Sequence, residues 1–517
     1  MGYMVFLKDG PHHQLMKVEK IKFKKEKKQK KKEKKPMHEA FATFGEWVSG
    51  GKNQAQAQVI RFQRGRDVKA RKHCVKVKGG ETKLTASAHK IRRISIQSNC
   101  EGRKLRQGTS GLSHVRSLTV FGGAKKIPPV VDFQVLRVLD LNDCSGLEDG
   151  DICDIGSLIY LRYIRIRNVS RIPSQIGKLR LLQTLDLTWT NVKELPETLI
   201  QLRHLVHLML PRDVKLPDGI SNMSSLEEIS NFSVVNNSAE LLLEIGNLMK
   251  LKVIGVDWFS DGRFCDDGIF MTNLVSSLCK LGDRALRSLG IWCWKPKCSL
   301  DFFVDSWSVP CQLQTFSTSG FGLDPCFSRL PKFTLSSRSE LRSLEFWVEQ
   351  LTAEDMQMLE GLPALLYLNL RTTRYMQETL FISRSGFQRL KEFNCQVSMD
   401  WQGLMFEAGA VPRIEKLFFG FPVHDTISTH GTGFDFGISH LSSLKCLQVH
   451  IECQGATVRE VEAAEAAIKN AATLLPKLPM PKIQRLMEFQ MVKEDEQGED
   501  TSDAEEQDVE QPGRSCA

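Results

Sequence analysis

Hydrophobic residues recur at fixed intervals from Leu161 to Met223, where one phrase is repeated three times. Each copy opens with three hydrophobic residues at the first, fourth and sixth positions, and the copies begin 21 and 23 residues apart. The three openings are Leu161, Ile164, Ile166; Leu182, Leu185, Leu187; and Leu205, Leu208, Leu210. Each copy closes on a hydrophobic residue followed by proline, at Ile172-Pro173, Leu195-Pro196 and Leu216-Pro217. Such internal repetition predicts a solenoid, an array of similar units that stack on one another.

The same opening recurs from residue 88 to residue 457 and gives fifteen candidate units. Their first hydrophobic residues are Ile91, Val115, Leu136, Leu161, Leu182, Leu205, Leu226, Leu251, Leu286, Leu313, Leu341, Leu365, Leu390, Ile414 and Leu444. A period of about 20 to 29 residues is typical of leucine-rich repeats, in which each unit adds one short parallel strand to a solenoid. We therefore predict an α/β solenoid, a leucine-rich-repeat horseshoe with a parallel β-sheet on its concave face. Gaps of 35 residues after Leu251 and 30 after Ile414 predict insertions on the helical or loop side.

Charge divides the rest of the chain into segments of different character. Lys17 to Lys35 holds twelve lysines and three glutamates, whereas Glu494 to Glu510 holds ten acidic residues and no basic one. Blocks of like charge remain solvated, so we expect a largely disordered basic leader over 1–87 and an acidic disordered tail over 481–517. Alanines and Glu/Lys pairs from Val458 to Leu475 predict an amphipathic helix. We assign residues 458–480 to a helix that caps the last repeat.

The residues between the core leucines form a candidate binding face. In a strand they point away from the core, and fifteen strands at about 4.8 Å spacing give a wall of roughly 70 Å, large enough for a protein partner. Arginine and aromatic residues dominate the strongest contacts of protein interfaces. The candidate protein-binding residues are Tyr163, Arg165, Arg167, Thr184, Asp186, Trp189, His207, Trp258, Trp292, Trp347, Tyr367, Arg371 and Phe418. The alternative is that some of these tryptophans fold back against the solenoid.

No pattern of polar residues indicates catalysis. The chain lacks a phosphate-binding loop, and Cys293, Cys298 and Cys311 lack the paired spacing of a zinc site. We therefore predict no catalytic residues, no cofactor and no metal, so the protein is not expected to be an enzyme. The sequence also contains neither a long apolar run nor a signal peptide, which favours a cytoplasmic location, with a nuclear location as the alternative.

Several phrases resemble the leucine-rich-repeat region of plant intracellular immune receptors, especially grass members of the coiled-coil nucleotide-binding class. They include HKIRRISIQSN, FQVLRVLDLNDC, IPSQIGKLRLLQTLDLTWTNVKELPETLIQLRHLVHLML and REVEAAEAAIKNAATLLP, and the resemblance covers residues 88 to 480. It implies a repeat region that helps to perceive pathogen effectors and restrains a nucleotide-controlled switch. The coiled coil and the nucleotide-binding module have no counterpart in this sequence, so we do not expect nucleotide binding.

Two hypotheses of function follow. The first is a non-catalytic recognition module of plant defence whose concave face binds a pathogen effector, a host protein or the switch part of a receptor relative. The second is a nuclear, nucleic-acid-associated scaffold that uses the lysine block of residues 17–35, whose binding would weaken with salt. Neither hypothesis involves a small-molecule substrate or a membrane.

Overall fold

The computed structural model of the protein describes the repeat region in fourteen stretches. They are residues 74–78, 91–97, 112–121, 127–142, 144–258, 268–293, 299–307, 309–319, 325–331, 339–372, 380–397, 404–430, 434–476 and 480–492. The chain forms two compact units, Met1–Lys69 and Ala70–Ala517, and every described residue belongs to the second. The lysine block and the acidic segment Glu494 to Glu510 lie outside the described residues.

All fifteen expected cores form strands of one parallel sheet, which confirms the predicted repeat pattern. These strands are β2 (Arg93–Gln97), β3 (Ser117–Phe121), β4 (Val138–Asp140), β5 (Tyr163–Arg167), β6 (Thr184–Trp189), β7 (His207–Met209), β8 (Glu228–Ser233), β9 (Val253–Trp258), β10 (Ser288–Cys293), β11 (Thr315–Ser319), β12 (Ser343–Val348), β13 (Tyr367–Thr372), β15 (Glu392–Val397), β17 (Lys416–Pro422) and β18 (Cys446–Glu452). Each pairs with its neighbours in chain order. The fold is therefore an α/β solenoid.

Alternation along each strand separates the core from the solvent side. Ile164, Leu185, Leu208 and Ile229 occupy paired positions on four neighbouring strands, and none is exposed to solvent. The row continues through neighbouring repeats, so each repeat buries its apolar side against the next. A single unit could not do so alone. The stability of the fold is thus distributed along the whole row.

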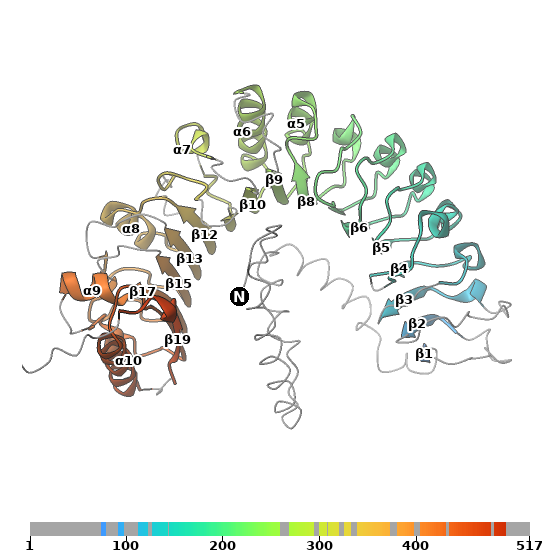
Figure 1. Ribbon diagram of the computed structural model, residues 1–517. Helices are drawn as coiled ribbons and strands as arrows, with labels where there is room; N and C mark the ends of the chain where they lie inside the picture. Colours follow the sequence, from blue (N-terminus) through green and yellow to red (C-terminus); the bar gives the residue numbers. More distant parts are fainter. Residues whose placement is uncertain are drawn as a thin grey trace, which may run out of the picture. The chain divides into compact units, whose positions relative to one another are not determined.

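Helical segments cover the core face of this sheet, and Figure 1 shows α5, α6, α7 and α8 on the same side of the strands. The described α-helices are α5 (Ala239–Ile245), α6 (Gly268–Gly282), α7 (Phe302–Ser306), α8 (Ala353–Glu360), α9 (Val423–His430) and α10 (Val458–Thr473). The shorter 3-10 segments are η4 (Leu112–His114), η5 (Val130–Asp132), η6 (Asp149–Ile152), η7 (Ile155–Ser157), η8 (Ser174–Lys178), η9 (Glu197–Gln201), η10 (Ile220–Asn222), η12 (Ile438–His440) and η13 (Glu488–Gln490). Pro173 and Pro196 stand directly before η8 and η9, where proline loses no helical hydrogen bond. The repeated hydrophobe-proline step therefore starts these segments.

The two long gaps in the repeat spacing contain helices. Helix α6 lies between β9 and β10 and packs on α5, where the Ser277 hydroxyl donates to the Leu242 carbonyl at 2.7 Å. Helix α9 lies between β17 and β18. Strands β14 (Leu380–Ile382) and β16 (Leu404–Phe406) form a separate two-stranded parallel sheet. The expected insertions are thus additional helical structure between strands.

The sheet extends past the expected repeat boundaries at both ends. Strand β1 (Cys74–Lys78) pairs with β2 and precedes residue 88, and β19 (Lys482–Leu486) pairs with β18 and follows residue 480. The expected helix is present as α10, with Thr457 and Glu460 forming a capping box at its start. It contacts α9 and η12, and the last strand of the sheet is β19. Helix α10 therefore precedes one further strand of the sheet, and its role as a cap stays a prediction.

Candidate functional site

The side of the sheet opposite the helices, which we call the sheet face, carries the strand positions between the core residues. Strand register places Tyr163, Thr184 and His207 side by side in one row, and Arg165, Asp186 and Met209 in the next. Paired residues on neighbouring strands lie close enough for side chains of adjacent repeats to contact one another. Two clusters of candidate residues result.

The N-terminal cluster centres on an ion pair between β5 and β6. Arg165 Nε donates to Asp186 Oδ2 at 2.8 Å, and Asp186 Oδ1 accepts hydrogen bonds from the Thr188 backbone N–H and hydroxyl at 3.1 and 2.7 Å. Burial raises the pKa of Tyr163, Arg165 opposes this, and Asp140 and Asp186 raise the pKa further. The phenol therefore stays neutral, and the Arg165 guanidinium is held in one orientation.

An exposed aromatic residue lies at the edge of this cluster. The register between β5 and β6 shifts after Arg165, so Arg167 pairs with Trp189, and its guanidinium carbon lies 5.6 Å from the indole centroid. This distance permits a cation–π interaction. Trp189 remains 60% exposed, which makes it the most accessible of the candidate tryptophans. The arginine thus contacts an indole ring that is largely exposed to solvent.

His207 and Glu228 form a buried pair beside the cluster. His207 Nδ1 and Glu228 Oε2 lie 2.9 Å apart, and both side chains are almost fully buried. Thr184, which precedes His207 in the same row, is also buried. We infer that these three residues support the face more than they offer surface to a partner.

Trp258 does not lie on the sheet face, which corrects its expected position. It shares the core side of β9 with Ile254 and Val256, is 3% exposed, and its ring lies 5.8 Å from the Phe302 ring of α7. The reason is the two-residue period of a strand, which directs Trp258 to the same side as Val256. Asp257 takes the face position and is itself buried.

Trp292 lies on the sheet face but folds against the sheet. A β-carbon added to Gly255 would come within 2.5 Å of the Trp292 ring, and one added to Gly290 within 3.0 Å. These two glycines, paired across β9 and β10, leave the space that the indole occupies. Trp292 is therefore half-buried, as the alternative hypothesis for the tryptophans foresaw.

The C-terminal cluster lies on β12, β13 and β15. The Arg371 guanidinium carbon lies 5.9 Å from the centroid of the Trp347 ring, and Asn369 Nδ2 donates to Glu345 Oε1 at 2.9 Å. Trp347 is 7% exposed, so the arginine and its neighbours cover most of the indole. Burial raises the pKa of Glu345, although Arg371 and the Asn369 hydrogen bond oppose the rise. Arg371 thus remains beside a carboxylate whose charged form is disfavoured.

Two further candidates flank this cluster. Asn394 Nδ2 donates to the Tyr367 hydroxyl at 3.4 Å, and burial raises the pKa of Tyr367, with Glu345 contributing further. The Phe418 ring meets His450 edge-on at a centroid distance of 4.6 Å. Sequence reasoning selected arginines and aromatic residues and so missed their polar partners Asn369, Asn394, Glu228 and His450. The alternation used for the selection already places them on the same face.

The described residues include no group of three or more His, Cys, Asp or Glu side chains that could hold a metal ion. Within those same ranges, no helix is both long and apolar enough to cross a membrane. The arrangement offers shaped, charged and aromatic surface.

Comparison with known proteins identifies the architecture. The family described as "leucine-rich repeat region" matches residues 114–481. The chain belongs to this leucine-rich repeat family. A solved leucine-rich repeat protein of Leptospira interrogans is 14% identical, with a TM-score of 0.43 over 78% of this chain and 93% of that one. We assign the fold from the family match and from the strand order.

The leucine-rich repeats of this chain are similar to those of rice disease resistance proteins. The protein RGA5 of Oryza sativa subsp. japonica is 29% identical over 406 residues, covering 76% of this chain and 35% of the relative. Pik-2 from the same organism is 28% identical over 331 residues, covering 57% and 31%. The chain spans about a third of the length of these curated relatives.

Proposed function

We propose that this leucine-rich repeat chain is a non-catalytic recognition module of plant immunity that binds a protein partner through its sheet face. The partner is a pathogen effector, a host protein or the nucleotide-binding switch part of a receptor relative, and binding takes place in the cytoplasm. The names of the rice relatives support the role in disease resistance. The repeat fold and those relatives point to a module without enzymatic activity.

The observation that carries the proposal is the pairing of arginine with tryptophan on neighbouring strands of the sheet face. Arg167 lies over Trp189 in one cluster and Arg371 over Trp347 in the other. Prior contacts restrict these side chains, so a partner loses less conformational entropy when it engages them. Trp189 supplies exposed apolar area, while the ion pair of Arg165 and Asp186 supplies fixed charge. Aromatic and arginine groups of this kind dominate the energy of protein interfaces.

Affinity capture from leaf extract tests the proposal with paired variants. The face variant combines Trp189→Ala and Arg167→Ala, and the control combines Met249→Ala and Ile269→Ala, two exposed apolar residues that do not belong to the sheet face. Quantitative mass spectrometry compares the captured proteins from healthy and infected leaves. The face variant should lose the proteins that wild type captures, while the control keeps them. Capture that survives the face substitutions and fails in the control would overturn the proposal.

The nucleic-acid hypothesis rests on the lysine block, which lies outside the described residues. It therefore remains a prediction of the sequence. Salt-sensitive RNA or DNA binding that disappears when residues 17–35 are deleted would support it.

A further inference from the structure

A row of arginines runs along the start of strands β2 to β5. We call Arg92, Arg116, Arg137 and Arg162 the arginine ladder, because each follows the first core residue of its repeat. The backbone N–H groups of Arg116, Arg137 and Arg162 donate to the carbonyl of the preceding ladder residue at 2.8, 2.8 and 2.9 Å. Direct bonding between neighbouring strands spaces the four residues about 4.8 Å apart. The backbone positions of four like-charged residues therefore form one line.

The equivalent positions of later repeats continue this line. There, basic residues stand beside glutamates that neutralise their charge. Lys252 Nζ lies 2.8 Å from Glu227 Oε2, its neighbour in the line. Lys391 and Lys445 both pair with Glu415, which stands between them, at 3.6 and 2.5 Å. Between Arg92 and Arg162 the line holds no carboxylate.

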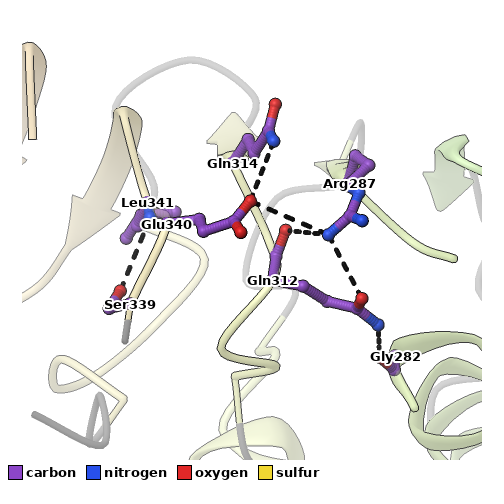
Figure 2. Close-up of polar contacts among 7 residues, drawn as sticks. All are labelled: Gly282, Arg287, Gln312, Gln314, Ser339, Glu340 and Leu341. Carbon is purple, nitrogen blue, oxygen red and sulfur yellow. Dashed lines mark hydrogen bonds and ion pairs between the residues drawn. The ribbon is translucent and has the colours of Figure 1, made fainter. Parts of the chain in front are cut away.

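Arg287 illustrates how a later position is neutralised. Figure 2 shows its guanidinium between Gln312 and Glu340, with Nη1 at 3.1 Å from the Gln312 carbonyl and 3.8 Å from Glu340 Oε2. Gln314, the next residue in the line, donates to the same Glu340 oxygen at 3.0 Å. One carboxylate thus serves two neighbouring positions.

The ladder side chains have different surroundings from Arg287. Arg92 Nη1 donates to the His114 carbonyl at 3.2 Å, Arg116 and Arg137 are exposed, and Arg162 is half-buried. Within the described stretches, neither Arg137 nor Arg162 forms an ion pair with a carboxylate. Neighbouring guanidinium groups repel one another, and an anion placed along the line would relieve this repulsion.

We propose that the arginine ladder binds the acidic segment Glu494 to Glu510 of this chain. That segment offers ten carboxylates, and no basic residue within it competes with the ladder for them. Guanidinium groups bind carboxylates through paired hydrogen bonds, and this geometry favours arginine over lysine. The ladder residues stand just before the strands and include none of the proposed partner-binding residues, so this inference goes beyond the proposed function.

The test uses the full chain with the ten acidic residues of the segment changed to Asn or Gln, which prevents competition in the same molecule. A fluorescein-labelled peptide of residues 494–510 is the probe, and fluorescence anisotropy gives its dissociation constant. The ladder variant carries Arg116→Gln, Arg137→Gln and Arg162→Gln. The control carries Lys178→Gln, Arg203→Gln and Lys250→Gln, three exposed cations outside the ladder.

The ladder variant should bind the peptide about tenfold more weakly, the sum expected of three exposed charge pairs, while the control changes little. Raising the salt concentration should weaken wild-type binding towards that of the ladder variant. The single Arg137→Gln change provides a milder variant, since this side chain is exposed, and circular dichroism verifies folding of each protein.

The lysine block is the competing site for an acidic peptide, so a third variant changes its twelve lysines to Gln. Peptide binding that disappears in this variant and persists in the ladder variant would overturn the proposal. So would equal losses in the ladder and control variants. Peptide binding should be unaffected by Trp189→Ala with Arg167→Ala, which separates this inference from the proposed function.

Discussion

The contact of Trp292 with Gly255 predicts that one substitution has opposite effects in two backgrounds. In Gly255→Ala the new β-carbon would lie 2.5 and 2.7 Å from two atoms of the indole ring, closer than carbon atoms approach. The ring must move off the sheet, which also takes it away from its place over Gly290. Overpacking of this kind costs about 1 to 3 kcal/mol.

Removal of the indole reverses the sign of the effect. In the Trp292→Ala background the nearest remaining atom to the new methyl group is the Asn231 nitrogen at 3.4 Å, an ordinary contact. Alanine is then favoured over glycine within a strand by roughly 0.5 to 1 kcal/mol. We therefore expect Gly255→Ala to destabilise the wild type, to stabilise Trp292→Ala, and to give a coupling free energy of about 2 kcal/mol.

Urea denaturation of the four proteins of this cycle, followed by far-UV circular dichroism, measures the coupling. The urea midpoints are compared only between proteins whose unfolding free energy has the same dependence on urea concentration, because long repeat arrays do not always unfold in a single step. Equal shifts in both backgrounds would refute the placement of the indole over Gly255. The shift in the wild-type background should be accompanied by a change in tryptophan fluorescence.

Three further predictions concern stability. Gly437→Ala should lower the free energy of unfolding by more than about 3 kcal/mol, because the φ of Gly437 is +67° and the new β-carbon would meet the Phe406 carbonyl oxygen. An unchanged melting temperature in calorimetry would refute this prediction. Leu185→Ala should cost about 2 to 5 kcal/mol in urea denaturation, since Leu185 is fully buried, and a cost below about 1 kcal/mol would contradict the packed core row. The raised pKa of Glu345 means that the folded state retains the proton longer, so stability falls as pH rises above about 4.5. In Glu345→Gln the free energy of unfolding should fall less steeply with rising pH. Urea midpoints measured across the pH range would contradict this if wild type and Glu345→Gln showed the same pH dependence.

The sequence allowed the repeat core to be predicted because leucine spacing directly reflects burial. Every expected core segment became a strand, since each must cover the apolar side of its neighbours. Strands β1 and β19 were missed because CVKVK and KIQRL are short segments that lack the six-position opening of the repeats. Their place in the sheet depends on pairing with β2 and β18.

Positions on the sheet face were less predictable than the core. Alternation placed Trp347 and Arg371 on that face, but only the register between β12 and β13 reveals that they are neighbours. Trp258 was misplaced because an aromatic residue was given more weight than its two-residue offset from Val256. Trp189 is exposed and pairs with Arg167 after a register shift that is not apparent from the repeat pattern.

Site-specific photo-crosslinking in leaf extract tests most directly whether the sheet face binds the partner. A photoreactive amino acid is introduced at Trp189 or Tyr367 on the face, and at Met249 or Ile269 away from it. The proposed function predicts that both face positions crosslink one common protein and that neither of the other positions does. Crosslinking of that protein from Met249 or Ile269 alone would contradict binding through the sheet face.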